Sequence, residues 1–298
     1  MSVLPATTTS FASELLSTVD STQASIQHLS QELATGTSIL APSDNPAGAV
    51  QTLSAQAAQA VTNGYVTSAA DGVSRLGLFT STMNSVIDQI SQVQQAVLSV
   101  STAQTSPVGM AALATKVKSI ATSLLTEANT TYEGYAIFGG TSGARQAYDA
   151  AGNYAGNGVV ATRTVASGTQ LPVGVPGTAV FGSGATGLFG VLSQTVADLS
   201  AGNTSAVLNS DLAAINASYA TAESSAATLG AQYDQMSAAG TAAGLASQTL
   251  GDQVSSLSST NLAKVATALQ LRQSSLQAAL WATSQVSSVT SSILQYLP

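Results

Sequence analysis

The chain has 298 residues, no cysteine, one histidine, 7% charged residues and a formal net charge of −7 at pH 7. The lack of cysteine excludes disulfides and thiolate metal sites, and the acidic balance argues against nucleic-acid binding. Small residues dominate and aromatic residues make up only 5%. Helices can therefore approach one another closely, and little material is left for a bulky catalytic core.

The first ten residues are rich in Ser and Thr and include Pro5. We expect them to be irregular, or to become ordered only on assembly. They lack the basic region and apolar run of a cleaved secretory leader. The sequence contains no apolar stretch of about 18 residues, so we expect no membrane-spanning helix. If the protein is extracellular, we expect it to leave the cell without a cleaved signal peptide.

A heptad pattern predicts a first helix over residues 11–35, which Gly36 ends. Its seam residues alternate at spacings of four and three: Leu15, Val19, Thr22, Ile26, Leu29 and Leu33. This spacing places them on one face of a helix. Such a face needs a partner helix to cover it.

Prolines and glycines between residues 36 and 48 predict an irregular connector, and Asp44 or Asn45 can cap a helix that begins at Pro46. This second helix should reach about residue 105. Irregular stretches are expected at three of its glycines, Gly64, Gly72 and Gly77. Its apolar heptad positions are Leu76, Phe79, Met83, Val86, Ile90, Val93 and Val97. A third helix is predicted over residues 110–131, with five inward positions, Leu113, Val117, Ile120, Leu124 and Ala128.

The character of the sequence changes over residues 135–187, where glycine is frequent. Residues 135–138 predict a strand, and residues 159–166 and 169–175 predict a hairpin around Ser167 and Gly168. Residues 178–181 predict another short strand. We expect a small β-rich insertion here.

Helical patterns return at Leu188, break at Gly202 and then continue to Leu257. The strictest heptad comprises Leu208, Leu212, Ile215, Tyr219, Ala222, Ala226, Leu229, Tyr233 and Met236. A slip in phase predicts a joint at residues 258–261. The last helix, over residues 261–297, has a seam of two alternating sets: Leu262, Leu269, Leu276, Thr283, Thr290 and Leu297, and Val265, Arg272, Ala279, Val286 and Ile293. Arg272 and the threonines weaken this seam.

These patterns predict a mainly α fold, an elongated and nested helical rod with the small β-rich insertion at its distal end. We expect a terminal coiled-coil assembly domain (residues 1–45 and 258–298), an inner helical rod domain (residues 46–134 and 188–257) and a β-rich outer domain (residues 135–187). Neighbouring subunits should be needed to order the weak terminal seams. The predicted assembly interface comprises Leu15, Val19, Ile26, Leu29, Leu33, Leu262, Val265, Leu269, Leu276, Val286, Ile293 and Leu297.

We find no catalytic, cofactor-binding or metal-binding pattern in the sequence. His28 stands alone beside the first seam, whereas a histidine metal site needs further ligands. The glycine-rich residues 182–187 lack the lysine of a P-loop. The acidic residues are spread along the chain, and acid/base catalysis needs carboxylates placed close together. The simpler interpretation of His28 is a solvated surface residue, and that of residues 182–187 is a flexible turn. The acidic residues are most simply interpreted as solvated charges.

Two terminal segments resemble a known family. Residues 33–36 (LATG) and 41–48 (APSDNPAG) resemble the N-terminal signature of bacterial flagellins and their relatives. The run from Asn261 to Leu297 is similar to their C-terminal signature, with Asn261 where members often carry aspartate. In the middle, residues 133–141, 154–158 and 177–181 resemble the hook-associated protein 3 branch of this superfamily, the hook–filament junction proteins.

The resemblance implies a non-enzymatic structural component of the bacterial flagellum, without a cofactor, nucleic-acid partner or membrane insertion. It implies export through the flagellar type III apparatus, with an export chaperone, to an extracellular position. There, copies of the chain would form a ring between hook-associated protein 1 and the flagellin filament. Two alternatives stay open: a short flagellin that forms the filament itself, and a secreted binding module or enzyme built on residues 135–187.

Overall fold

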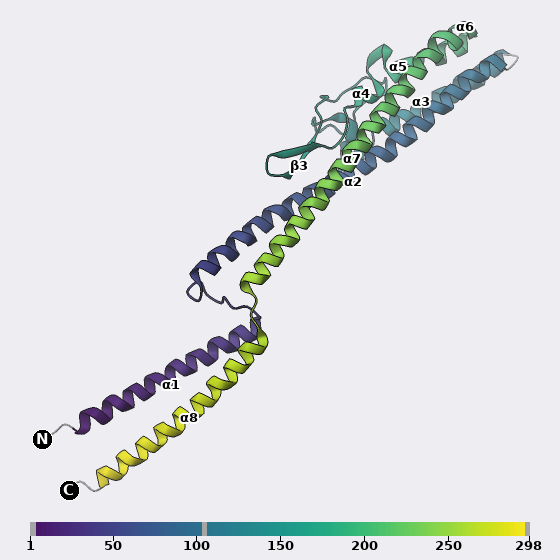
Figure 1. Cartoon of the computed structure of the whole chain (residues 1–298). Coiled ribbons are helices and arrows are strands. Elements are labelled where there is room, and N and C mark those ends of the chain that lie inside the picture. Colours follow the sequence, from purple (N-terminus) through teal and green to yellow (C-terminus); the bar gives the residue numbers. More distant parts are fainter. Residues whose placement is uncertain (1–3, 103–105, 296–298) are drawn as a thin grey trace. The chain divides into compact units, whose positions relative to one another are not determined.

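The computed structural model describes residues 4–102 and 106–295, with side chains described over residues 13–101 and 106–285. Long helices make up most of the described chain, which has two small two-stranded sheets (Figure 1). The expected mainly α fold with a small β-rich insertion is confirmed. The chain forms two compact units: Met1–Gln59 with Gln248–Pro298, and Ala60–Ser247. The three-part division into domains stays a prediction.

The first unit contains helix α1 (Leu4–Thr35) and helix α8 (Leu262–Gln295). Because α1 begins at Leu4, the expectation of an irregular start is wrong from that residue onward. Pro5 lies in the first turn, where its missing N–H removes no helical hydrogen bond. Gly36 ends α1 as expected, with a φ of 69° and its N–H donated to the Glu32 carbonyl at 2.9 Å.

Helix α2 (Pro46–Thr102) begins at the predicted proline, and the Asn45 side chain caps it by accepting the Gly48 N–H at 2.9 Å. Asp44 has another role: its carboxylate accepts the N–H groups of Leu40 and Ala41 within the connector, at 3.0 and 2.7 Å. The first unit also contains the end of helix α7 (Leu212–Ser258). The predicted joint therefore lies between α7 and α8.

The second unit is built around the apolar stripe of α2. The seven heptad residues predicted for its core are all fully buried: Leu76, Phe79, Met83, Val86, Ile90, Val93 and Val97. Helix α2 runs without interruption through Gly64, Gly72 and Gly77, so the predicted irregular stretches are absent there. A side chain at Gly72 would approach the Met236 sulfur to 2.8 Å. This glycine thus allows α7 to pack closely against α2.

Helices α3 (Pro107–Ala128) and α5 (Leu188–Ala201) pack against each other and complete the helical core. Residues 103–105 lie outside the described residues, so the predicted end of α2 near residue 105 is not tested. Helix α3 ends three residues before its predicted end, because residues 131 and 132 form a strand. That strand, β1 (Thr131–Tyr132), pairs antiparallel with β2 (Tyr135–Ala136).

The insertion contains more helical turns than its sequence pattern predicts. The strand expected at residues 135–138 lasts two residues before the 3₁₀ turn η1 (Ile137–Gly139). The predicted hairpin is confirmed as β3 (Thr162–Ala166) and β4 (Thr169–Pro172). The strand predicted at residues 178–181 is wrong, because helix α4 (Gly177–Phe181) occupies this segment. A run of this length has too few residues for its periodicity to separate a strand from a helical turn.

Three short elements complete the second unit: η2 (Gly184–Thr186), α6 (Thr204–Ala206) and the π-helical turn η3 (Val207–Asp211). The turn η3 directly precedes α7, so α6, η3 and α7 are continuous. A π turn adds one residue to the helical repeat. For this reason a heptad pattern does not predict it.

A cluster of aromatic rings fixes the insertion to the helices. The Phe138 ring packs edge-on against Phe79 and Phe181, with both centroid distances 5.1 Å. The Tyr148 hydroxyl donates to the Gly182 carbonyl at 2.8 Å. The Asn129 side chain, just after α3, accepts the Tyr148 N–H at 2.9 Å and donates to the Tyr148 carbonyl at 2.9 Å. The insertion is therefore anchored by a buried apolar contact and by satisfied polar groups.

Helix α3 passes the length and composition test for a membrane-spanning helix. It does so although Lys116 and Lys118 interrupt its apolar residues, so it is not the continuous apolar stretch that the sequence lacks. A buried helix of a folded core passes the same test. One face of α3 packs into the core of the second unit, through Met110, Ala114, Val117, Ile120, Leu124 and Ala128.

Replacing Phe138 by Ala should lower the free energy of unfolding by about 3 to 5 kcal/mol, because the substitution leaves a cavity between Phe79 and Phe181. Chemical denaturation of the purified chain measures this loss. Tyr135→Ala is the matched control, since that side chain is exposed. Equal losses in both variants would contradict the central position of Phe138.

Asp211 in η3 predicts a pH-dependent stability. Its side chain is 5% exposed, and one carboxylate oxygen has no hydrogen-bond partner among the described residues. Burial, and after it the charge of Asp198, raises the pKa of Asp211. The folded state is therefore penalised above this raised pKa, and the penalty disappears as the pH falls toward the pKa of the unfolded chain.

Asp211→Asn should consequently stabilise the chain by about 1 kcal/mol at pH 7 and by much less at pH 4. Thermal unfolding at the two pH values measures the difference. Asp88→Asn makes the same charge change at an exposed position of α2. A gain that is equal at both pH values, or that the Asp88 variant shares, would show that burial of the Asp211 charge is not its cause.

Candidate assembly interface

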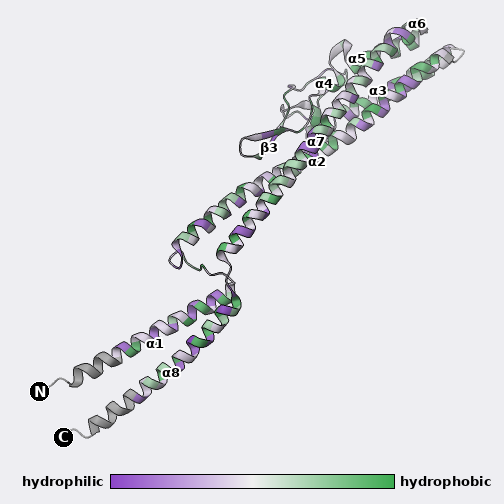
Figure 2. Ribbon diagram, in the orientation of Figure 1, coloured by the Kyte–Doolittle hydropathy of each residue, from purple (hydrophilic) through white to green (hydrophobic). Residues whose placement is uncertain are grey.

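Helices α1 and α8 pack against each other within the first unit. Apolar and polar residues alternate along the coloured parts of both helices, as Figure 2 shows. Among the described seam positions, Thr22 and Val265 are buried. Six of the predicted interface residues are half-buried in this pair: Leu15, Val19, Ile26, Leu29, Leu269 and Leu276. The two helices therefore cover each other only in part.

The remaining predicted interface residues are exposed or lie beyond the described side chains. Leu33 and Leu262 are exposed, at the ends of α1 and α8 that adjoin the connectors. Val286 and Ile293 belong to α8, but their side chains lie outside the described part, as does the whole of Leu297. The structure thus brings the central seam together. The assignment of these residues to an interface between subunits stays a prediction.

Four large apolar residues outside the predicted interface are also exposed: Leu16, Leu271, Leu280 and Trp281. Leu271 and Trp281 are each 67% exposed. With 100° per residue, they lie about 120° and about 160° around α8 from the buried Val265. They therefore point away from α1. Heptad reasoning omitted them because it follows only the seam. Their size and their position off the seam were the signal that could have identified them.

A polar joint fixes the ends of α1 and α7 beside each other within the first unit. Thr37 and Ser259 form an isolated antiparallel bridge. Around it, Ser38 N–H donates to the Ser258 carbonyl at 2.7 Å, and Thr260 N–H donates to the Gly36 carbonyl at 3.0 Å. The Thr260 hydroxyl also donates to the Glu32 carboxylate. This joint satisfies backbone groups at the end of α1 and next to the start of α8.

His28 has a partner that the sequence did not predict. Its Nε2 lies 3.5 Å from Asp44 Oδ1. The Ala41 N–H, followed by the Leu40 N–H and His28, lowers the pKa of Asp44. The histidine therefore contributes to the connector. No group of three or more metal-ligating side chains is found in the described residues.

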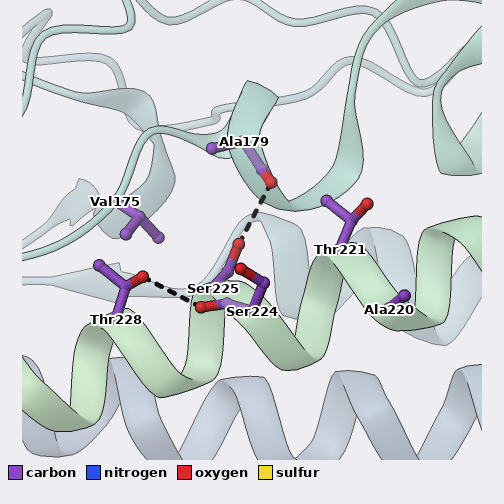
Figure 3. A pocket seen from close by; sticks show the side chains of 7 residues that line it. All are labelled: Val175, Ala179, Ala220, Thr221, Ser224, Ser225 and Thr228. Atoms are coloured by element: carbon purple, nitrogen blue, oxygen red, sulfur yellow. Dashed lines mark hydrogen bonds between the residues drawn. The ribbon is translucent and has the colours of Figure 1, made fainter.

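A hollow of about 520 Å³ in the second unit lies between α4 and α7 (Figure 3). Four hydroxyl side chains line it: Thr221, Ser224, Ser225 and Thr228. Ser225 donates to the Ala179 carbonyl at 3.2 Å, and Thr221 and Thr228 donate to carbonyls of their own helix. Most of these hydroxyls are thus used within the fold, and they do not form a convergent set of donors for a ligand.

Comparison with known proteins finds a family match in the N-terminal part of this chain. Residues 7–143 match the family model of the bacterial flagellin N-terminal helical region. This segment begins within α1 and includes the connector, α2, α3, β1, β2 and η1. The chain therefore carries a flagellin-type N-terminal region. None of the curated protein sequences matches the chain.

Solved structures share the fold. A Vibrio parahaemolyticus chain named as a flagellar hook-associated protein is 18% identical, with a TM-score of 0.67 over 72% of this chain and 100% of its own. Bacillus cereus FlgL is 18% identical, with a TM-score of 0.59 over 68% and 99%. The flagellar junction protein FlgL from Legionella pneumophila is 12% identical, with a TM-score of 0.57 over 72% and 100%. At these identities the likeness establishes a common fold.

Val265→Ala should weaken the α1–α8 pair in the isolated chain by about 1 to 2 kcal/mol, because two buried methyl groups are lost. Amide hydrogen exchange should then become faster in both helices. Leu271→Ala is the matched control, since its side chain points away from α1. Faster exchange in the Leu271 variant as well would contradict the assignment of the seam.

Proposed function

We propose that this chain is a structural subunit of the bacterial flagellum, of the hook-associated protein 3 type, which joins the hook to the flagellin filament by helical self-assembly. The observation that carries the proposal is an α1–α8 pair that buries few of its own apolar side chains and exposes large ones on its outer faces. The flagellin-type N-terminal region and the fold shared with junction proteins support it.

The proposal assigns the terminal helices to contacts between subunits. An exposed Leu or Trp becomes stabilising when a neighbouring copy covers it, and the gain is about 1.5 to 3 kcal/mol for a fully buried side chain. Leu16, Leu271 and Trp281 are the described residues best placed for this contact. Along with the predicted seam residues, they form the proposed assembly surface.

The partners follow from this role. We infer further copies of the chain in a ring, hook-associated protein 1 on the hook side and flagellin on the filament side. An export chaperone and an extracellular position on the flagellum, reached without a cleaved signal peptide, belong to the same proposal. A structural role without catalysis fits the polar side chains described above, such as Asn45 in a cap, Thr260 in the joint and Asn129 in an anchor.

The alternative is a short flagellin that forms the filament, because the matched N-terminal region is that of flagellins. Deletion of the gene separates the two roles. A junction subunit predicts cells without filaments that release flagellin into the medium. A purified chain that polymerises indefinitely by itself would instead establish the flagellin role.

The double variant Leu271→Ala/Trp281→Ala should leave the thermal unfolding of the isolated chain nearly unchanged, since both side chains are exposed. It should reduce incorporation of the chain into flagella at least tenfold, as measured by immunoblotting of purified flagella. Val108→Ala, which changes an exposed residue of the second unit, is the control. Normal incorporation of the double variant would refute the assignment of this surface.

A further inference from the structure

The hairpin β3–β4 stands apart from the helices at its tip and is fastened at its base. Its strands pair only with each other among the described residues. Val165 in β3 and Val173 just after β4 are buried. Residues 166–170, which include the turn, are exposed. Figure 1 shows the hairpin beside α2 and α7.

Two residues of α2, one helical turn apart, hold the two strands of the hairpin base. Asp71 accepts the Arg163 guanidinium of β3 at 2.5 Å. Arg75 donates from Nε to the Val173 carbonyl, directly after β4, at 3.1 Å. The i, i+4 spacing places both side chains on one face of α2. We call Asp71, Arg75 and Arg163 the clamp.

Asp71 also connects the first small sheet to the clamp. Its second oxygen accepts the Tyr132 hydroxyl of β1 at 2.8 Å. Partial burial raises the pKa of Asp71, but the hydrogen bonds from Arg163 and Tyr132 outweigh this effect and hold the pKa below its usual value. The carboxylate is therefore charged at neutral pH. Its two oxygens thus hold Tyr132 of β1 and Arg163 of β3 to the same helix.

Beyond the clamp, an apolar groove of about 660 Å³ separates the hairpin from the helices. Val165, Ala166, Thr169 and Leu171 line it on the hairpin side, and Thr62 and Tyr65 on the side of α2. The α7 side consists mainly of small residues: Ala238, Ala239, Ala242, Ala243 and Ala246. The nine residues from Asp71 back to Thr62 span roughly 14 Å of α2. The hairpin thus extends along α2 from the clamp over the groove.

We propose that the β3–β4 hairpin is a hinged flap, whose base the clamp fixes and whose tip opens and closes over the apolar groove. Movement of the tip toward α7 buries the alanine face, which favours closure. The clamp restricts this movement because Asp71 and Arg75 hold the two strands at separate points. A two-stranded hairpin has little stability of its own and depends on such anchors.

Hydrogen exchange of the full chain, followed by mass spectrometry, tests the flap. Asp71→Asn and Arg163→Gln should each make exchange at least tenfold faster in residues 162–172, while residues 212–236 of α7 keep their protection. The double variant should exchange no faster than either single one, because both substitutions remove the same interaction. Asp234→Asn, an equal charge change at an exposed position of α7, should leave the hairpin unchanged.

The absence of cysteine allows a second measurement on the same variants. Spin labels at Ser167→Cys in the turn and Thr241→Cys on α7 report the distance across the groove. Asp71→Asn should broaden this distance distribution, and Asp234→Asn should not. An unchanged distribution together with unchanged hairpin exchange would overturn the proposal. Faster exchange throughout α7 would also overturn it, since Asp71 would then support the whole unit and not the flap.

Discussion

Small side chains on the α1–α8 seam limit how much apolar surface this pair can bury. Thr22 and Ala279 occupy seam positions, whereas the corresponding heptad positions of α2 carry large residues such as Leu76 and Met83. Hydrophobic stabilisation scales with the apolar area removed from water, so the pair gains little from its own contact. The large residues Leu271 and Trp281 lie off the seam and gain little in the isolated chain, where each is 67% exposed. The first unit therefore leaves apolar surface that its own helices do not cover.

The second unit, in contrast, buries large apolar side chains within its own core. Its stripe on α2 is long, made of large residues and fully buried, and α3, α5 and α7 cover it. Such a core covers its own apolar stripe without a partner chain. Helices α2 and α7 belong to both units. The boundary between the two units therefore falls within α2 and α7 and not at a helix end.

The helices and the core of the second unit were predictable from the sequence because heptad spacing reports burial directly. Leu76 to Val97 illustrate this, and so do Val117 and Leu124 in α3. The insertion was less predictable, since residues 178–181 are too few to show a period. The turn η3 adds a residue that no heptad contains. The polar joint joins Ser38 to Ser258, and the clamp joins Asp71 to Arg163; neither contact leaves a local pattern. On the candidate interface, the sequence identified the seam but not the outward Trp281.

The insertion and the helices are stabilised by different kinds of contact, and this has a consequence for how the protein can change. The insertion is held by a few specific groups, among them Phe138, Asn129 and the clamp, whereas the helices share a continuous apolar core. Substitutions between these anchors, for example in the exposed turn of the hairpin, leave the core untouched. The terminal helices have no such freedom if they contact neighbouring copies, because every outward residue then faces another chain. If those contacts form, substitutions disturb the protein least in the insertion and most on the outer faces of α1 and α8.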